Sequence, residues 1–174
     1  GNWLQPTLGF ERYYDKPPAY FWIVAGAFRA FGRHEWAARL PSVLAAALTI
    51  AGVVGFAWRR IGGRAALLAG LVLATAVQFV VLGRSVRMDM LLTCLMTATL
   101  LSAYRFWEPD AEGTQASWPL YAFPAFGLLV KGPVAVVLPA LIVVAFLAVT
   151  RTPPAFRRLR PNAAAESTFS AVAG

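Results

Sequence analysis

Long apolar runs, separated by short turns that carry charges or prolines, make up most of the chain. Runs without a charged residue cover residues 40–58, 65–83, 90–104, 116–130 and 132–150. An α-helix rises about 1.5 Å per residue, so a run of about 20 residues can cross the hydrocarbon core of a bilayer. Inside lipid the backbone must satisfy its own hydrogen bonds, and a helix does so. The pattern therefore predicts an all-α membrane protein, built as a polytopic helical bundle.

The turns between the runs divide the chain into four parts. We predict a transmembrane bundle over residues 36–150, with about five spans at residues 36–58, 65–83, 90–107, 118–130 and 134–150. Residues 17–32 open with two prolines and are rich in aromatic residues but too short to span, which favours an interfacial helix. Residues 1–16 are expected to form an extracytoplasmic loop, and residues 151–174 a cytoplasmic loop or a ragged truncated end.

Composition supports the membrane interpretation. The 174 residues are 59% hydrophobic and only 14% charged, whereas soluble domains carry about 25% charged residues. The net charge is +8, but the arginines mark the ends of the apolar runs and do not alternate with exposed aromatic residues. We therefore expect membrane lipids, and not nucleic acid, as the partner of this basic chain.

Counting the predicted spans places several charged residues on one side of the membrane. Two spans separate Asp89 from Lys131, so both should lie on the same face. Lys16, Arg84 and Arg87 join them if the 17–32 helix does not cross. The cations then divide evenly between the two faces, so the positive-inside rule assigns neither face to the cytoplasm. Because an external face is normally poor in cations, this even division suggests that the external cations have a function.

The chain has only two lysines, and each stands beside a proline at the edge of an apolar run. Lys16 lies in the sequence YYDKPP and Lys131 in VKGP. A lysine at the bilayer boundary is costly unless it meets an anion, so both are candidate functional residues. Lys16 precedes a helix N-terminus, which also attracts phosphate. The alternative for Lys16 is a side chain that only anchors the helix end by reaching the membrane surface.

A short charged turn, RSVRMD at residues 84–89, lies between two predicted spans. Arg84 and Arg87 are three residues apart and can share one face of a helical turn. Asp89 could pair with Arg87, orient a substrate or hold a metal ion. A charged turn of this kind also occurs commonly between spans without any further role.

Taken in order, these motifs resemble one known family. GNWLQP at residues 1–6, YDKPPAYFW at 14–22, WAARLPS at 36–42, RSVRMDMLLT at 84–93 and VKGP at 130–133 are similar to the N-terminal membrane region of GT-C glycosyltransferases. The resemblance is to the protein O-mannosyltransferase and aminoarabinose-transferase type, which includes glycosyltransferase family 39. It covers about residues 1–160, and the ordered set is more specific than any single motif.

The resemblance implies a function and a set of roles. Such enzymes take a sugar from a polyprenyl-phosphate-linked donor and transfer it to a lipid, protein or glycan acceptor outside the cytoplasm, here at the bacterial inner membrane. It implies that Lys16 and Lys131 bind the donor phosphate with help from Arg84 and Arg87. Asp89, Asp15 and Tyr14 would order the site. The candidate site residues are therefore Tyr14, Asp15, Lys16, Arg84, Arg87, Asp89 and Lys131.

The resemblance also implies that the catalytic base lies outside this sequence. In the family the base is a carboxylate just upstream of the segment that matches residues 1–6, so we expect it before Gly1 and expect this chain to be an inactive fragment of the enzyme. Asn2 also stands where the family often has an acid. No cofactor follows from the motifs, and dependence on a divalent metal stays open. Two other classes remain: a transporter or flippase-like protein for an anionic solute, and a non-catalytic membrane scaffold.

Overall fold

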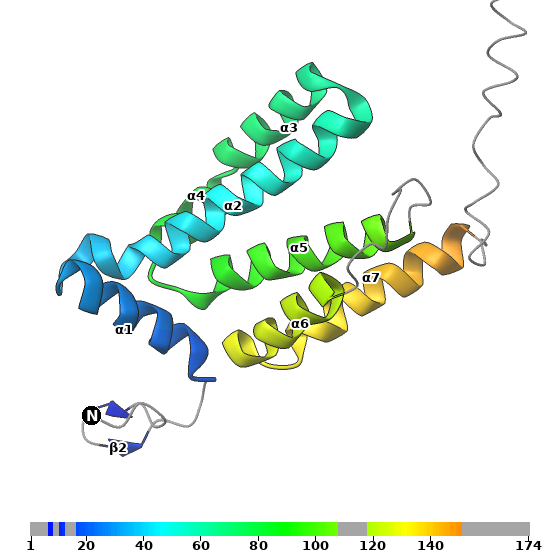
Figure 1. Ribbon diagram of the computed structural model, residues 1–174. Helices are drawn as coiled ribbons and strands as arrows, with labels where there is room; N and C mark the ends of the chain where they lie inside the picture. Colours follow the sequence, from blue (N-terminus) through cyan, green and yellow to red (C-terminus); the bar gives the residue numbers. More distant parts are fainter. Residues whose placement is uncertain (1–6, 9–10, 13–16, 108–117, 151–174) are drawn as a thin grey trace, which may run out of the picture.

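The computed structural model describes residues 7–8, 11–12, 17–107 and 118–150. Two short strands, β1 (Thr7–Leu8) and β2 (Glu11–Arg12), pair in antiparallel fashion. Helices form the rest of the described chain (Figure 1): α1 (Ala19–Phe31), α2 (Glu35–Ile61), α3 (Gly63–Thr75), α4 (Val77–Arg84), α5 (Met88–Trp107), α6 (Trp118–Lys131) and α7 (Val134–Thr150). The all-α class predicted from the apolar runs is confirmed.

Helix α1 begins where the sequence predicts, directly after the proline pair. The backbone amide of Trp22 donates to the carbonyl of Pro18 over 3.1 Å, which closes the first helical turn. Gly32 ends the helix with a φ of 83°, in a region that glycine adopts without steric cost. The chain then turns into α2, and α1 packs against α2. Helix α1 has 13 residues, which fits the predicted interfacial helix in length.

The expected span at residues 65–83 is not one straight helix. It is divided into α3 and α4, which meet at Ala76 with a bend of 63°. The hydroxyl of Thr75 donates to the carbonyl of Leu71 over 2.8 Å and contacts that of Val72 at 3.3 Å. Such back-bonding by threonine bends helices. The pattern of apolar residues did not predict this break.

Helix α5 lies between α2 on one side and the pair α6 and α7 on the other (Figure 1). It packs on α2, α6 and α7. Gly127 allows α6 to approach α7 closely, since a Cβ atom added there would lie 2.6 Å from the Cβ of Ala135. Gly132 has a φ of 90° and forms the tight turn that ends α6 at Lys131. These contacts fix the end of α6 beside the start of α5.

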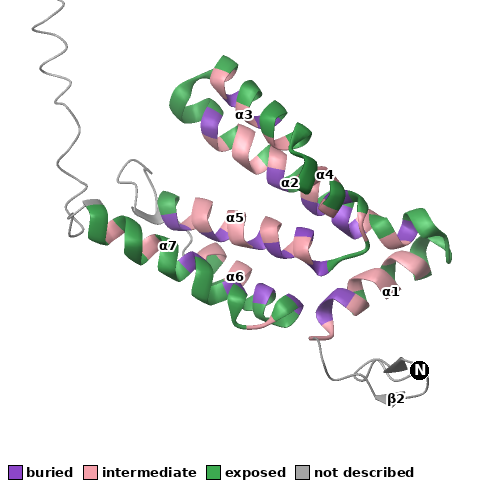
Figure 2. Ribbon diagram, turned by 180° about the vertical axis from the view of Figure 1, so that it is seen from behind, coloured by how far each residue is buried: buried purple, intermediate pink, exposed green. Residues whose placement is uncertain are grey.

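The small core lies where α1, α5 and α6 meet. It consists of Ala19, Tyr20, Met88, Leu95 and Val130. Elsewhere large apolar side chains remain exposed on the outer faces of the helices (Figure 2). Water would make such an apolar exterior costly, whereas lipid would not.

Among the helices of the described residues, length and composition identify one, α2, that is long and apolar enough to cross a membrane. The bent pair of α3 and α4 makes a second if it counts as one span, and α1 and α7 are apolar but shorter. The predicted number of about five spans therefore stays a prediction. The helices follow one another along the chain as that prediction assumed, apart from the break at Ala76.

Candidate functional site

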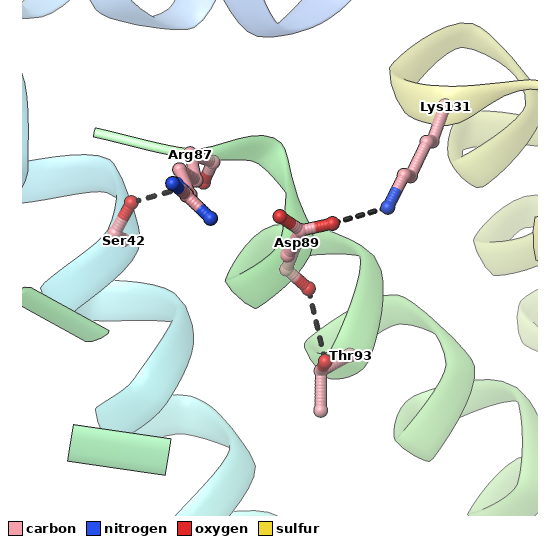
Figure 3. Close-up of polar contacts among 5 residues, drawn as sticks. All are labelled: Ser42, Arg87, Asp89, Thr93 and Lys131. Atoms are coloured by element: carbon pink, nitrogen blue, oxygen red, sulfur yellow. Dashed lines mark hydrogen bonds and ion pairs between the residues drawn. The ribbon is translucent and has the colours of Figure 1, made fainter. Parts of the chain in front are cut away.

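The centre of the site is an ion pair between Lys131 and Asp89 (Figure 3). Lys131 is the last residue of α6, and Asp89 is the second residue of α5. Helices α5 and α6 pack side by side, and the start of one meets the end of the other. The two residues therefore lie on the same face of the bundle, as the counting of spans predicted. The sequence did not predict that they bind each other.

The ion pair is open to the surroundings. The exposed fraction of the Lys131 side chain is 38%, and that of Asp89 is 32%. The hydroxyl of Thr93 donates to the backbone carbonyl of Asp89 over 2.9 Å, so it does not occupy the carboxylate. A second anion can thus approach Lys131 without first opening the protein.

Two arginines come just before this pair in the chain. Arg84 ends α4, Arg87 lies in the short connection to α5, and both are exposed. Within the described ranges, neither guanidinium forms an ion pair. The segment directly before Asp89 therefore carries two cations that no described carboxylate neutralises, whereas Lys131 shares its charge with Asp89.

A buried hydrogen bond holds the connection that carries Arg87. Ser42 of α2 is fully buried and donates to the backbone carbonyl of Arg87 over 3.3 Å (Figure 3). It therefore ties the chain just before Asp89 to α2. Sequence reasoning missed Ser42, although its place in the WAARLPS motif, as a hydroxyl at the start of a long apolar run, was an available signal.

The remaining predicted site residues, Tyr14, Asp15 and Lys16, lie outside the described residues. The described chain resumes at Pro17, and the next residues are informative. Ala19 and Tyr20 are buried in the same cluster as Met88 and Val130, the residues that directly precede Asp89 and Lys131. The start of α1 therefore lies against both helix ends that form the ion pair.

Tyr20 is the second residue that sequence reasoning missed. Only 4% of it is exposed, and its hydroxyl has no hydrogen-bond partner among the residues that the structure describes. The pattern of the sequence indicates only that it is one of several interfacial aromatic residues in the segment 17–32. Its position in the YDKPPAYFW motif, four residues after Lys16, was the signal that could have singled it out.

A metal centre is not formed by the described part of the chain, where no three His, Cys, Asp or Glu side chains gather closely enough to hold an ion. Asp89, the one candidate ligand in the site, has Lys131 as its partner.

The fold and the site together define a class: a helical membrane protein with a cation-rich cluster at the ends of its helices. Residues 15–166 match the family model described as dolichyl-phosphate-mannose-protein mannosyltransferase. The chain therefore belongs to this family, and the membrane location predicted from its apolar runs is supported by its relatives.

Several relatives bear one enzyme name, undecaprenyl phosphate-alpha-4-amino-4-deoxy-L-arabinose arabinosyl transferase. The protein of that name from Aeromonas salmonicida is 27% identical over 99% of this chain and 32% of its own length. A second, from Proteus mirabilis, is 31% identical over 82% of this chain and 26% of its own length. This chain thus spans about a third of the length of the curated relatives that it matches.

Solved structures show the same fold. ArnT from Cupriavidus metallidurans in the apo state superposes with a TM-score of 0.82 at 32% identity, covering 91% of this chain and 30% of ArnT. The structure of that ArnT bound to undecaprenyl phosphate gives a TM-score of 0.81 at 31% identity, covering 93% of this chain and 30% of ArnT. The GT-C type of membrane fold, which the motifs suggested, is confirmed.

Proposed function

We propose that this chain forms the donor-binding region of a membrane glycosyltransferase that uses a polyprenyl-phosphate-linked sugar. The observation that carries the proposal is the ion pair of Lys131 and Asp89 with Arg84 and Arg87 just before it in the chain. Family membership and the fold shared with an ArnT that binds undecaprenyl phosphate support it. In this proposal the helix ends that carry these residues bind the phosphate of the carrier lipid.

The charges of the site suit an anionic ligand. Lys131, Arg84 and Arg87 supply three positive charges, and Asp89 supplies one negative charge, which leaves a surplus of two. Lys16 adds a further cation if the segment before Pro17 stays beside the start of α1. A phosphate that approaches this cluster competes with Asp89 for the ammonium group of Lys131. Because the pair is about one-third exposed, water offsets part of the cost of that exchange; fully exposed pairs contribute about 0.2–1 kcal/mol.

The chemistry requires stabilisation of a leaving phosphate. In the transfer, the bond between the anomeric carbon of the sugar and the phosphate oxygen breaks, and a bond from that carbon to an acceptor oxygen forms. The acceptor proton passes to a general base, and the carrier leaves as polyprenyl phosphate with added negative charge. Fixed cations aimed at that charge lower the barrier. This is the role that we assign to Lys131 and the two arginines.

Asp89 is not the base in this proposal. Its carboxylate binds Lys131, and it serves to hold the ammonium group in place. The base is therefore a carboxylate from outside the described residues, as the resemblance implied. The acceptor is a lipid, a protein or a glycan, and the site faces the extracytoplasmic side of a bacterial inner membrane. The family resemblance is what implies that orientation, because the even division of cations assigns neither face to the cytoplasm.

The transporter alternative is less well supported. It requires polar or charged groups along a path through the bilayer. In the described helices the charged side chains lie near helix ends, as with Arg59 and Arg60 in the last turn of α2 and Lys131 in the last turn of α6. In the middle of α2 and α5, the hydroxyls of Thr49 and Thr99 donate to carbonyls of their own helices.

The test is Lys131→Ala in the complete gene product that contains these residues. Arg59→Ala is the matched control, because Arg59 is an exposed cation at the far end of α2. Transfer from a polyprenyl-phosphate sugar should fall about 100-fold in the Lys131 variant, with weaker binding of undecaprenyl phosphate and an unchanged melting temperature. Equal activity of the two variants would refute the proposal.

A further inference from the structure

The hydroxyl of Tyr20 is an unusual feature of the core. The ring packs with Met88, Leu95 and Val130, and the hydroxyl has no hydrogen-bond partner among the described residues. A buried hydroxyl without a partner lowers stability, whereas a phenylalanine would fill the same space without that cost. A tyrosine at this position is therefore explained if the hydroxyl forms a hydrogen bond in another state of the protein.

Two polar side chains lie near this hydroxyl. Burial raises the pKa of the Tyr20 phenol; an interaction with the Ser42 hydroxyl lowers it, and the negative charge of Asp89 raises it further. Ser42 donates its own proton to the carbonyl of Arg87 and keeps lone pairs that can accept a hydrogen bond. Asp89 directly follows Met88, which packs with Tyr20, and its charged carboxylate is the acceptor that gains most from a hydroxyl donor.

We propose that Tyr20 is a positioning residue, which donates a hydrogen bond to the carboxylate of Asp89 when Lys131 turns to the phosphate of the carrier. The inference rests on the proposed function. Without a new partner, Asp89 would keep its charge in a site that is two-thirds covered, and that would oppose release of Lys131. A hydroxyl donor removes this cost, because hydrogen bonds to a charged acceptor are stronger than neutral ones.

The exchange leaves Lys131 and Asp89 with a partner in both states and gives the Tyr20 hydroxyl a partner in the bound state only. In the carrier-free state, Lys131 binds Asp89, and the Tyr20 hydroxyl has no hydrogen-bond partner among the described residues. In the bound state, Lys131 binds the phosphate and Tyr20 binds Asp89. The free energy lost at Tyr20 in the first state is regained in the second, so the buried hydroxyl favours carrier binding.

The experiment compares Tyr20→Phe with Tyr121→Phe in the complete gene product. Tyr121 lies on α6 and is 67% exposed, so its variant controls for loss of a tyrosine hydroxyl. For Tyr20→Phe we expect an equal or higher melting temperature. We also expect a KM for the donor, and a Kd for undecaprenyl phosphate, about tenfold higher, with kcat within about twofold.

A double variant tests whether Tyr20 acts through Asp89. Once Asp89→Asn has removed the charge, adding Tyr20→Phe should raise KM no further. Additive losses, a KM equal to that of Tyr121→Phe, or a lower melting temperature would each overturn the inference. If Lys131→Ala impairs carrier binding while Tyr20→Phe does not, the role of Tyr20 alone is rejected. If Lys131→Ala leaves carrier binding intact, the proposed function fails, and this inference fails with it.

Discussion

Asp89 and Lys131 are 42 positions apart in the chain and form an ion pair across the ends of two neighbouring helices. In the proposed function, a phosphate competes with Asp89 for the ammonium group of Lys131. Asp89 holds the ammonium group near its working position, and it also competes with the ligand for that group. The effect of removing Asp89 should therefore differ between binding and turnover.

Asp89→Asn should separate these two effects. The amide keeps the shape of the side chain but no longer pairs with Lys131 as an ion. Since a partly exposed pair contributes about 0.2–1 kcal/mol, binding of undecaprenyl phosphate should tighten by up to about fivefold. The value of kcat should fall about tenfold or more, because Lys131 is no longer held in position. A direct binding assay and steady-state kinetics on the same preparation check both; weaker binding would show that Asp89 assists the phosphate directly.

Ser42→Ala should loosen the connection that carries Arg87. The change removes a buried donor and leaves the Arg87 carbonyl without that partner, at a cost of about 1–3 kcal/mol. Thermal or denaturant unfolding in detergent measures the loss. Ser85→Ala is the control, because the Ser85 hydroxyl donates to Val81 of its own helix over 2.6 Å and joins no other element. An equal effect of the two variants would contradict an anchoring role of Ser42.

Gly127→Ala should displace α6 from α7. The added methyl group would lie 2.6 Å from the Cβ of Ala135, closer than two carbon atoms can approach, and such overpacking costs about 1–3 kcal/mol. Gly26→Ala is the matched control, since nothing lies within 4 Å of its added Cβ and alanine favours a helix over glycine. The melting temperature should fall in the first variant and hold or rise in the second. Because Lys131 is the last residue of α6, the rate of sugar transfer should also fall in the Gly127 variant.

The sequence predicted the helices and predicted that Asp89 and Lys131 lie on the same face, because both follow from the order and length of apolar runs. It could not predict their ion pair, which depends on α5 and α6 being neighbours. The bend at Ala76 was also missed, because neither the back-bonding of the Thr75 hydroxyl to the preceding turn nor the extended conformation of Ala76 is visible in the pattern of apolar residues.

Contacts between side chains of different helices were the feature of the structure that the sequence predicted least. An aromatic residue near the start of a short apolar helix is typical of a membrane interface, and that was the interpretation given to Tyr20. Its burial against Met88 and Val130 requires three helices to meet, which no periodicity in one helix shows. Ser42 was missed for the same reason, since its partner lies 45 positions away.

Cysteine labelling should decide whether α3 and α4 cross the bilayer together. The 63° bend is compatible with a broken span or with a re-entrant loop, and the two place Arg59 differently. We expect a broken span, with Arg59 and Arg84 on opposite sides. Both residues are exposed at helix ends, so Arg59→Cys and Arg84→Cys should both react once the membrane is opened.

The labelling needs one prior change, because this sequence contains a cysteine, Cys94; Cys94→Ala, together with replacement of any other cysteine of the complete gene product, removes the background. In intact cells, a maleimide that cannot cross the membrane should modify position 84 and leave position 59 unmodified. Equal labelling of both positions from outside would show a re-entrant α3 and α4. In that case the basic turn beside Arg59 would share the face of the ion pair, and Arg59→Ala could no longer serve as the distant control for Lys131→Ala.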